Sequence, residues 1–131
     1  MAKAIHSMIR VLDEQRSIAF YKNAFDLNVA ERLDFDSFTL IYLSNSECTF
    51  ELELTVNKRQ SDAYDLGNGY GHLALSVTDL DAEHQKITQL GYQPRDIVEF
   101  NRDGNLFARF FFVKDPDGYD IEVLQRHGRF I

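Results

Sequence analysis

The sequence predicts an α+β fold made of two similar modules, each with a strand, a helix and about three further strands. Three observations support this prediction: a segment repeated in each half, a helical pattern directly after each copy, and short aromatic and β-branched segments after each helix. A repeat of this kind indicates two copies of one supersecondary unit. The 131 residues are enough for one domain with its own hydrophobic core, without disulfides.

The repeat pairs the segment AIHSMIRVLD, which ends at Asp13, with the segment YGHLALSVTD, which ends at Asp79. His6 aligns with His72, and the two Asp residues align at the same spacing of 66 residues. We therefore expect each half to open with a strand that carries a histidine.

Each copy is followed by a segment whose apolar residues recur at helical spacing. The first predicted helix covers residues 14–25, with Asp13 as its N-cap. The second covers residues 81–90, with Asp79 as its N-cap and Gly91 as its stop.

Segments rich in aromatic and β-branched residues predict the remaining strands. These segments are residues 36–44, 47–56, 96–100, 107–113 and 119–124. The sequences SNSE at 44–47 and DPDG at 115–118 predict hairpin turns, the second with Pro and Gly at favoured turn positions.

The composition excludes several classes of partner. Fourteen Lys and Arg against twenty-one Asp and Glu give a net charge of −7, which disfavours nucleic acid as a partner. The chain has no apolar signal segment or membrane span, and its single cysteine, Cys48, fits a reducing compartment. We therefore expect a cytoplasmic protein that binds neither nucleic acid nor membrane.

A second alignment concerns the acidic residues near the end of each half. TFELEL aligns with GYDIEV, which matches Glu53 with Glu122. Together with His6 and His72, these glutamates occupy equivalent places in two similar modules. Imidazole nitrogen and carboxylate oxygen suit Ni²⁺, Co²⁺, Zn²⁺ or Fe²⁺. The pattern therefore predicts one divalent cation bound by two His and two Glu.

The same residues also have a simpler interpretation. A strand histidine among apolar residues commonly packs at the edge of a core, and a strand glutamate usually faces water. The recurrence of both residue types in both halves favours the metal interpretation. His84, on the apolar stripe of its helix, and His127, in the polar tail, are predicted to lie outside the site.

Five motifs are spread over nearly the whole chain. They are H-x-x-x-R-V at 6–11, R-S-I-A-F-Y at 16–21, E-L-T-x-N at 53–57, Y-x-L-G-x-x-Y-G-H at 64–72 and D-P-D-G-Y-x-I-E at 115–122. With these motifs the chain resembles the glyoxalase I (lactoylglutathione lyase) family of the vicinal oxygen chelate superfamily, in its short bacterial form.

The resemblance implies two tandem βαβββ modules, residues 1–62 and 68–131, that form a cupped mixed sheet. It also implies a homodimer with metal sites at the interface. At each site, one module of one chain supplies a His–Glu pair and the second module of the partner chain supplies the other pair. The implied metal ligands are His6, Glu53, His72 and Glu122. Ni²⁺ or Co²⁺ is favoured as the metal, and Zn²⁺ is possible.

Further implied roles concern glutathione, whose γ-glutamyl end would be held by Arg10 and Asn57. Each lies four residues after a predicted ligand, so strand alternation places it on the face of that ligand. The alternatives are a surface salt bridge for Arg10 and a strand-end turn for Asn57.

The chain departs from the family pattern at several places, which include Ser7 in place of the usual apolar residue and Lys58, Arg59 and Gln60 after Asn57. Asp26 replaces the usual glycine after the first helix, and the loop predicted at 99–110 differs from the glycine-rich loop of the family. That loop commonly offers a lysine to the glycyl carboxylate of glutathione, a role left here to Arg102, Arg109 or another basic residue.

The implied activity is conversion of the methylglyoxal–glutathione hemithioacetal to S-lactoylglutathione by proton abstraction and enediolate stabilisation. Glu122 is the predicted base, and Glu53 is the second carboxylate. The alternative is another vicinal oxygen chelate protein: an epimerase or dioxygenase that does not use glutathione, or a drug-binding resistance protein.

Overall fold

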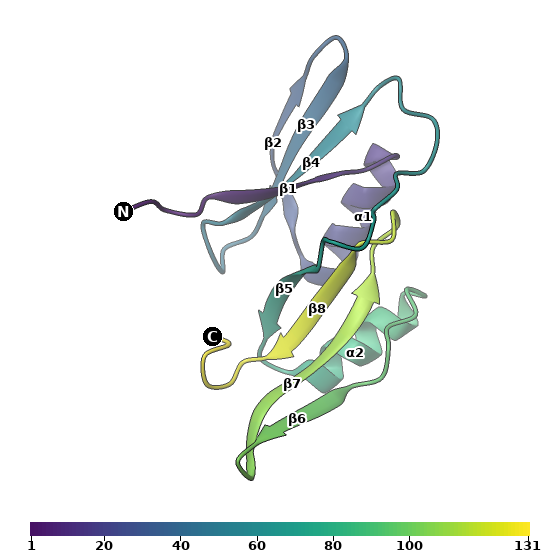
Figure 1. The fold of residues 1–131 in the computed structure, drawn as a ribbon. Helices are drawn as coiled ribbons and strands as arrows, with labels where there is room; N and C mark the ends of the chain where they lie inside the picture. The colour runs from purple at the N-terminus through teal and green to yellow at the C-terminus, as the bar shows by residue number, and fades with distance from the viewer. The chain divides into compact units, whose positions relative to one another are not determined.

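The computed structural model describes all residues 1–131 and divides them into two units, Met1–Asp65 and Leu66–Ile131. Each unit contains one helix and one four-stranded mixed sheet (Figure 1). The order of elements along the chain is strand, helix and three strands in both units. The predicted α+β fold with two βαβββ modules is therefore confirmed.

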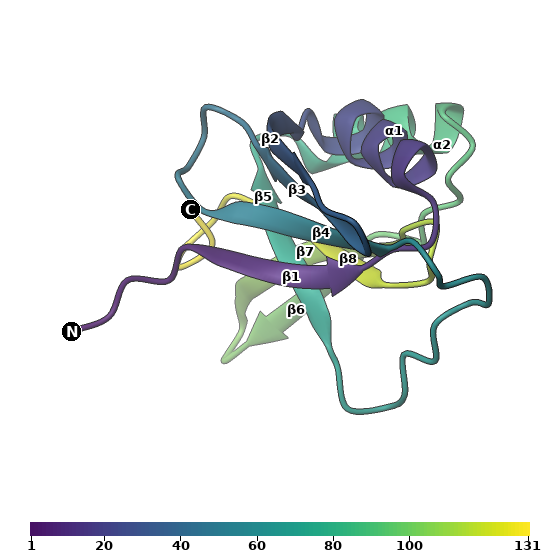
Figure 2. The same cartoon turned by 90° about the horizontal axis from the view of Figure 1, so that it is seen from above.

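The first unit contains β1 (His6–Arg10), α1 (Glu14–Phe25), β2 (Asn28–Asp34), β3 (Phe38–Ser44) and β4 (Glu51–Asn57). Its sheet has the order β1-β4-β3-β2, in which β1 and β4 are parallel and the other neighbours antiparallel. A parallel pair needs a long connection, and here that connection includes α1. Figure 2 shows α1 lying over one face of this sheet.

The second unit contains β5 (His72–Val77), α2 (Leu80–Gln89), β6 (Val98–Arg102), β7 (Asn105–Lys114) and β8 (Asp120–Gln125). Its sheet has the corresponding order β5-β8-β7-β6, again with one parallel pair, β5 and β8. The helix α2 contacts β7 and β8. The two sheets are thus built on the same plan.

Both helices begin at the predicted N-caps. The Asp13 side chain accepts a hydrogen bond from the backbone N–H of Arg16 at 3.0 Å, and Asp79 accepts one from Ala82 at 3.0 Å. These bonds satisfy backbone donors that have no partner within the helix. The helix α1 ends at Asp26, whose φ of 55° is left-handed, a conformation that aspartate adopts less readily than glycine. Neither helix has the length and apolar character needed to cross a membrane.

Each sheet has one face toward its helix and one face away from it. Along β4 and β8, Leu52, Leu54, Ile121 and Val123 are buried on the helix side. Because strand side chains alternate, Glu53 and Glu122 lie on the opposite faces of these strands. The core of each unit therefore leaves one sheet face for polar chemistry.

Two predictions about the strands were wrong. Strand β2 was not among the predicted segments, because all seven of its residues are exposed and it lacks a clear apolar alternation. The loop predicted at 99–110 is shorter than expected, because β6 and β7, predicted at 96–100 and 107–113, extend to Arg102 and from Asn105 and leave only Asp103 and Gly104 as the turn. Both turn residues have positive φ, 52° and 77°, as a two-residue type I′ hairpin turn requires.

Candidate functional site

In the first unit, His6 and Glu53 meet on the sheet face that points away from α1. Strands β1 and β4 pair in parallel with Met8 opposite Glu53, so His6 lies two residues along the same face. The His6 Nε2 atom lies 3.2 Å from Glu53 Oε2. The His6 side chain is 38% exposed and the Glu53 side chain 10%, so the imidazole can reach a ligand while the carboxylate is held in the sheet.

A third side chain, Tyr42, completes this cluster. It lies on β3 directly opposite Glu53, and its hydroxyl donates a hydrogen bond to Glu53 Oε1 at 2.9 Å. Its ring meets the His6 ring edge to face, with 6.0 Å between centroids. The hydrogen bond to Glu53 raises the pKa of the Tyr42 phenol above its ordinary value. Tyr42 was not among the predicted site residues, because its place beside Glu53 depends on the register between β3 and β4.

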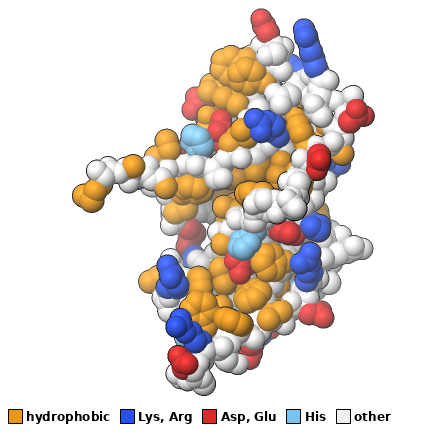
Figure 3. Space-filling model, in the orientation of Figure 1, with side chains coloured by type: hydrophobic (Ala, Val, Ile, Leu, Met, Phe, Trp, Pro, Cys, Tyr) orange, Lys and Arg blue, Asp and Glu red, His pale blue; other side chains and the backbone are white.

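The second unit holds the corresponding pair. Strands β5 and β8 are parallel with Ala74 opposite Glu122, which places His72 on the face of Glu122. The His72 Nε2 atom lies 2.8 Å from Glu122 Oε2, with side-chain exposures of 39% and 16%. In Figure 3 a histidine beside an acidic side chain can be seen at the surface. The residue opposite Glu122 on β7 is Phe112, whose ring lies edge to face with His72 at 5.2 Å.

The donor atoms of these two pairs fit a divalent cation of borderline softness. In each pair one imidazole nitrogen lies within 3.2 Å of one carboxylate oxygen, and nitrogen and oxygen donors together suit ions such as Ni²⁺, Co²⁺ and Zn²⁺. Neither unit gathers three or more potential ligands by itself. Each unit therefore presents one histidine and one glutamate as candidate ligands.

The two residues predicted to bind glutathione lie on the first sheet. Arg10 is the last residue of β1, opposite Thr55, and Asn57 is the last residue of β4. Alternation along the strands places both on the face of His6 and Glu53. Asn57 Nδ2 donates a hydrogen bond to the Tyr64 hydroxyl at 3.2 Å. Their role in binding glutathione stays a prediction.

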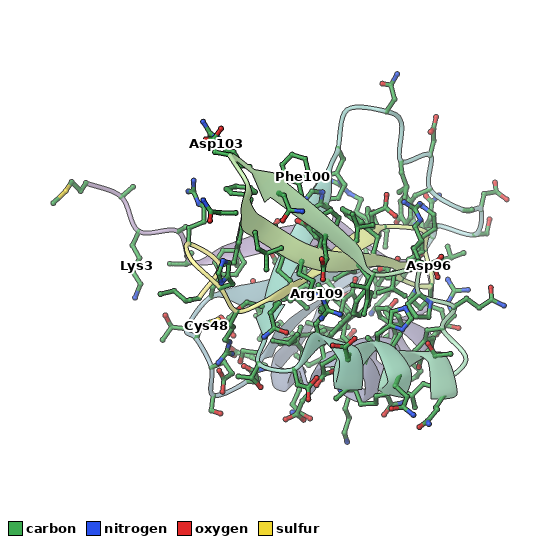
Figure 4. The ribbon with its side chains drawn as sticks, turned by 90° about the horizontal axis from the view of Figure 1, so that it is seen from below. Lys3, Cys48, Asp96, Phe100, Asp103 and Arg109 are labelled. Carbon is green, nitrogen blue, oxygen red and sulfur yellow. The ribbon has the colours of Figure 1, made fainter.

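The two candidate arginines of the β6–β7 hairpin differ sharply. Arg109 forms a bidentate ion pair with Asp81 of α2, at 2.8 and 2.9 Å, and a second contact with Glu99 at 3.3 Å. The hydrogen bonds raise the pKa of Arg109 and lower the pKa of Asp81. Figure 4 shows Arg109 on the α2 side of the hairpin and Phe100 on the other side.

Arg102 lies at the end of β6 and has a side chain that is 76% exposed, with Asp103 at 3.8 Å. Arg109 already has two carboxylate partners and lies on the α2 side of the sheet. Of the two, Arg102 is therefore the better candidate for a ligand carboxylate.

Exposed apolar side chains gather on the same hairpin, where Figure 3 shows a hydrophobic surface. They are Val98, Phe100, Leu106 and Phe107. Phe100 and Phe107 contact each other edge to face at 5.9 Å between centroids.

The other two histidines lie outside the His–Glu pairs. The His84 ring packs against Phe111 at 4.9 Å, and its Nε2 atom lies 2.8 Å from the Arg95 carbonyl oxygen. His127 Nε2 lies 3.1 Å from the Leu106 carbonyl oxygen. Both contacts are structural, as predicted.

Comparisons with known proteins agree with this architecture. The model of the glyoxalase/bleomycin resistance protein/dioxygenase superfamily matches residues 3–123. A probable lactoylglutathione lyase of Synechocystis is 37% identical over 126 residues, covering 92% of this chain and 93% of that protein. A lactoylglutathione lyase of Neisseria meningitidis is 34% identical over 129 residues, covering 95% and 91%.

A similar solved structure is the trypanothione-dependent glyoxalase I of Leishmania major. It has a TM-score of 0.77 and 32% sequence identity, and the match covers 95% of this chain and 87% of that one. The chain therefore belongs to the glyoxalase/bleomycin resistance protein/dioxygenase superfamily and, within it, to the lactoylglutathione lyase (glyoxalase I) family.

Proposed function

We propose that this protein is a metal-dependent lactoylglutathione lyase that converts the hemithioacetal of methylglyoxal and glutathione to S-lactoylglutathione. The observation that carries this proposal is the convergence of one histidine and one glutamate on the open sheet face of each unit, at 3.2 Å and 2.8 Å. Family membership with proteins named lactoylglutathione lyase gives the reaction class.

The proposed metal ligands are His6, Glu53, His72 and Glu122. Each unit supplies two donors, so a complete site needs both kinds of pair. In the homodimer that we propose, one pair comes from one chain and the other from its partner, with metal sites at the interface. Ni²⁺ or Co²⁺ is the proposed ion, with Zn²⁺ as the alternative, since nitrogen and oxygen donors serve all three.

When bound, the cation would polarise the substrate oxygens and make the neighbouring C–H more acidic. The protein then has to remove a proton from C1 and return one to C2. We assign the removal to Glu122, whose Oε2 atom faces His72, so that Oε1 is the oxygen that takes the proton. Such a general-base step contributes about 10²- to 10⁴-fold to the rate. Glu53 is the second carboxylate at the site.

We assign recognition of glutathione to cationic and amide groups. Arg10 and Asn57 share a sheet face with His6 and Glu53, which supports their contact with the γ-glutamyl end. A guanidinium can bind a carboxylate with two parallel hydrogen bonds. Arg102 is our choice for the glycyl carboxylate, because Arg109 is already paired with Asp81.

The alternative of a different superfamily protein is not favoured, because the relatives matched over more than nine-tenths of the chain are named lactoylglutathione lyase. The cytoplasmic location stays a prediction, supported by the single cysteine.

The test mixes Ni²⁺-loaded protein with methylglyoxal and glutathione and measures the formation of the thioester product by its absorbance. The variant Glu122→Gln should retain most of its bound metal, measured by mass spectrometry, and lose about 10²- to 10⁴-fold in kcat. The matched control is Glu99→Gln, which changes an exposed carboxylate on the α2 side of the second sheet. Wild-type kcat in Glu122→Gln would refute its role, and an activity series with Ni²⁺, Co²⁺ and Zn²⁺ would identify the metal.

A further inference from the structure

The Glu53 carboxylate has a different partner on each of its oxygen atoms. His6 Nε2 lies 3.2 Å from Oε2, and the Tyr42 hydroxyl donates to Oε1 at 2.9 Å. Tyr42 reaches Oε1 because it is the residue opposite Glu53 in the antiparallel pair of β3 and β4. The two contacts favour an orientation in which Oε2 faces His6 and Oε1 faces Tyr42.

Burial makes the Tyr42 hydrogen bond important. Glu53 is only 7% exposed, so water has little access to its oxygens. A buried carboxylate without hydrogen-bond donors is costly, and removing one donor leaves its acceptor unsatisfied. The Tyr42 hydroxyl therefore stabilises the orientation in which Oε2 faces His6.

The second unit lacks a corresponding hydrogen bond from an aromatic hydroxyl to its glutamate. Phe112 lies opposite Glu122 at the position that Tyr42 occupies opposite Glu53. Its ring keeps the edge-to-face contact with the histidine, at 5.2 Å, but it has no hydroxyl for the Glu122 carboxylate. A phenol hydroxyl therefore faces the carboxylate of Glu53 but not that of Glu122.

We infer that Tyr42 is a positioning residue that holds Glu53 as a fixed metal ligand, while Phe112 leaves Glu122 Oε1 open to take the substrate proton. This inference rests on the proposed function and deepens it, because it explains how two equivalent glutamates perform different tasks. Hydrogen-bond partners of metal ligands orient those ligands and commonly change metal affinity or activity by about 10- to 100-fold.

The test measures the binding of Co²⁺ alone, by competition with a chromophoric chelator, in wild-type protein and in Tyr42→Phe. Removal of the hydroxyl should weaken Co²⁺ binding by about tenfold and change the visible absorption spectrum of the bound ion. The ring remains against His6, so the fold should be kept and the far-UV circular dichroism spectrum should not change. The control is Tyr92→Phe, which removes a hydroxyl beyond the end of α2 and should leave Co²⁺ affinity and spectrum as in the wild type.

The reciprocal variant Phe112→Tyr offers the same hydroxyl to Glu122. It should lower kcat by about tenfold or more, with little change in KM or Co²⁺ affinity, since the oxygen that takes the proton becomes occupied. The double variant Tyr42→Phe/Phe112→Tyr should show both losses.

Equal Co²⁺ affinity and spectrum in wild type and Tyr42→Phe would overturn the inference, as would an unchanged kcat in Phe112→Tyr. A wild-type protein that binds Co²⁺ but makes no thioester would refute the proposed reaction, while weaker binding in Tyr42→Phe would still support the positioning of Glu53. A wild-type protein that binds no Co²⁺ would refute both.

Discussion

The two units have the same strand order and the same His–Glu pair, but they differ in the aromatic residue that faces the glutamate. The first unit has Tyr42 at that position and the second has Phe112. Both rings meet the nearby histidine edge to face, with 6.0 Å and 5.2 Å between centroids, but only the first unit has the hydroxyl. The difference shows how a duplicated unit can keep its frame while its two carboxylates acquire different surroundings.

The cores of the two units differ in a second way. In the first unit the largest buried aromatic residues, Phe20 and Tyr21, belong to the helix, where their rings meet at 5.0 Å. In the second unit the helix contributes Leu80 and Ile87, and the buried aromatic residue Phe111 comes from strand β7. The buried aromatic side chains of the core therefore come from the helix in the first unit and from a strand in the second.

The largest expected effect tests whether the two histidines are equivalent. His6→Ala and His72→Ala should each weaken Ni²⁺ binding by more than about 100-fold and abolish thioester formation. The reason is that removing a metal ligand weakens binding more than removing a hydrogen-bond partner of a ligand, which commonly costs about 10- to 100-fold. Calorimetric titration measures the affinity, with His84→Ala, outside both pairs, as the control. Loss of binding in only one of the two variants would end the equivalence of the units.

The next effect concerns the core and its different origins. Phe20→Ala and Phe111→Ala should each lower the free energy of unfolding by about 3–5 kcal/mol, since both residues are at most 1% exposed. Urea denaturation measures the loss. The control Phe100→Ala, at a residue that is 55% exposed, should cost less than about 1 kcal/mol. A small loss in the free energy of unfolding for Phe111→Ala alone would show that the aromatic residue from the strand contributes less to stability than the one from the helix.

A smaller effect tests the shared start of the two helices. Asp13→Ala and Asp79→Ala should each destabilise the protein by about 1 kcal/mol, because both caps accept one backbone hydrogen bond at 3.0 Å. The measurement is the thermal unfolding midpoint. Asp13→Asn and Asp79→Asn keep the capping oxygen and should be nearly neutral, and equal losses in the Asn and Ala variants would contradict the capping role.

The smallest effect concerns one exposed aspartate in each unit. Hydrogen bonds from Lys58 and Thr39 lower the pKa of Asp34 below its ordinary value of 3.8. Hydrogen bonds from Arg109 lower the pKa of Asp81 in the same way. A carboxyl with a lowered folded-state pKa adds stability above its unfolded pKa and loses that contribution as the pH falls through the folded value. Asp34→Asn and Asp81→Asn should therefore be slightly less stable than wild type at neutral pH and equally stable at about pH 2. Urea midpoints measured at both pH values test this, and a difference that persists in acid would argue against an ionic origin.

Much of this architecture could be predicted from local patterns. The helix α1 has the predicted bounds, Glu14–Phe25, because its cap and apolar spacing lie within one continuous segment. The alignment of the two halves identified His6, Glu53, His72 and Glu122 as one set of candidates, and the structure places His6 beside Glu53. Strand β2 was missed because its exposed residues carry no apolar pattern, although its hydrogen bonds to β3 hold it in the sheet.

The sequence by itself determined the duplication, the helix caps and the set of two His and two Glu residues shared by the two halves, since these follow from residues at matching positions along the chain. That each His lies beside its Glu was decided by the pairing of β1 with β4 and of β5 with β8. Only the tertiary structure decided that Tyr42 faces Glu53 and that Arg109 binds Asp81. The physical reason is strand register: a side chain meets its partner on another strand only after pairing has set which residues are opposite, and a shift of one residue would turn every side chain to the other face.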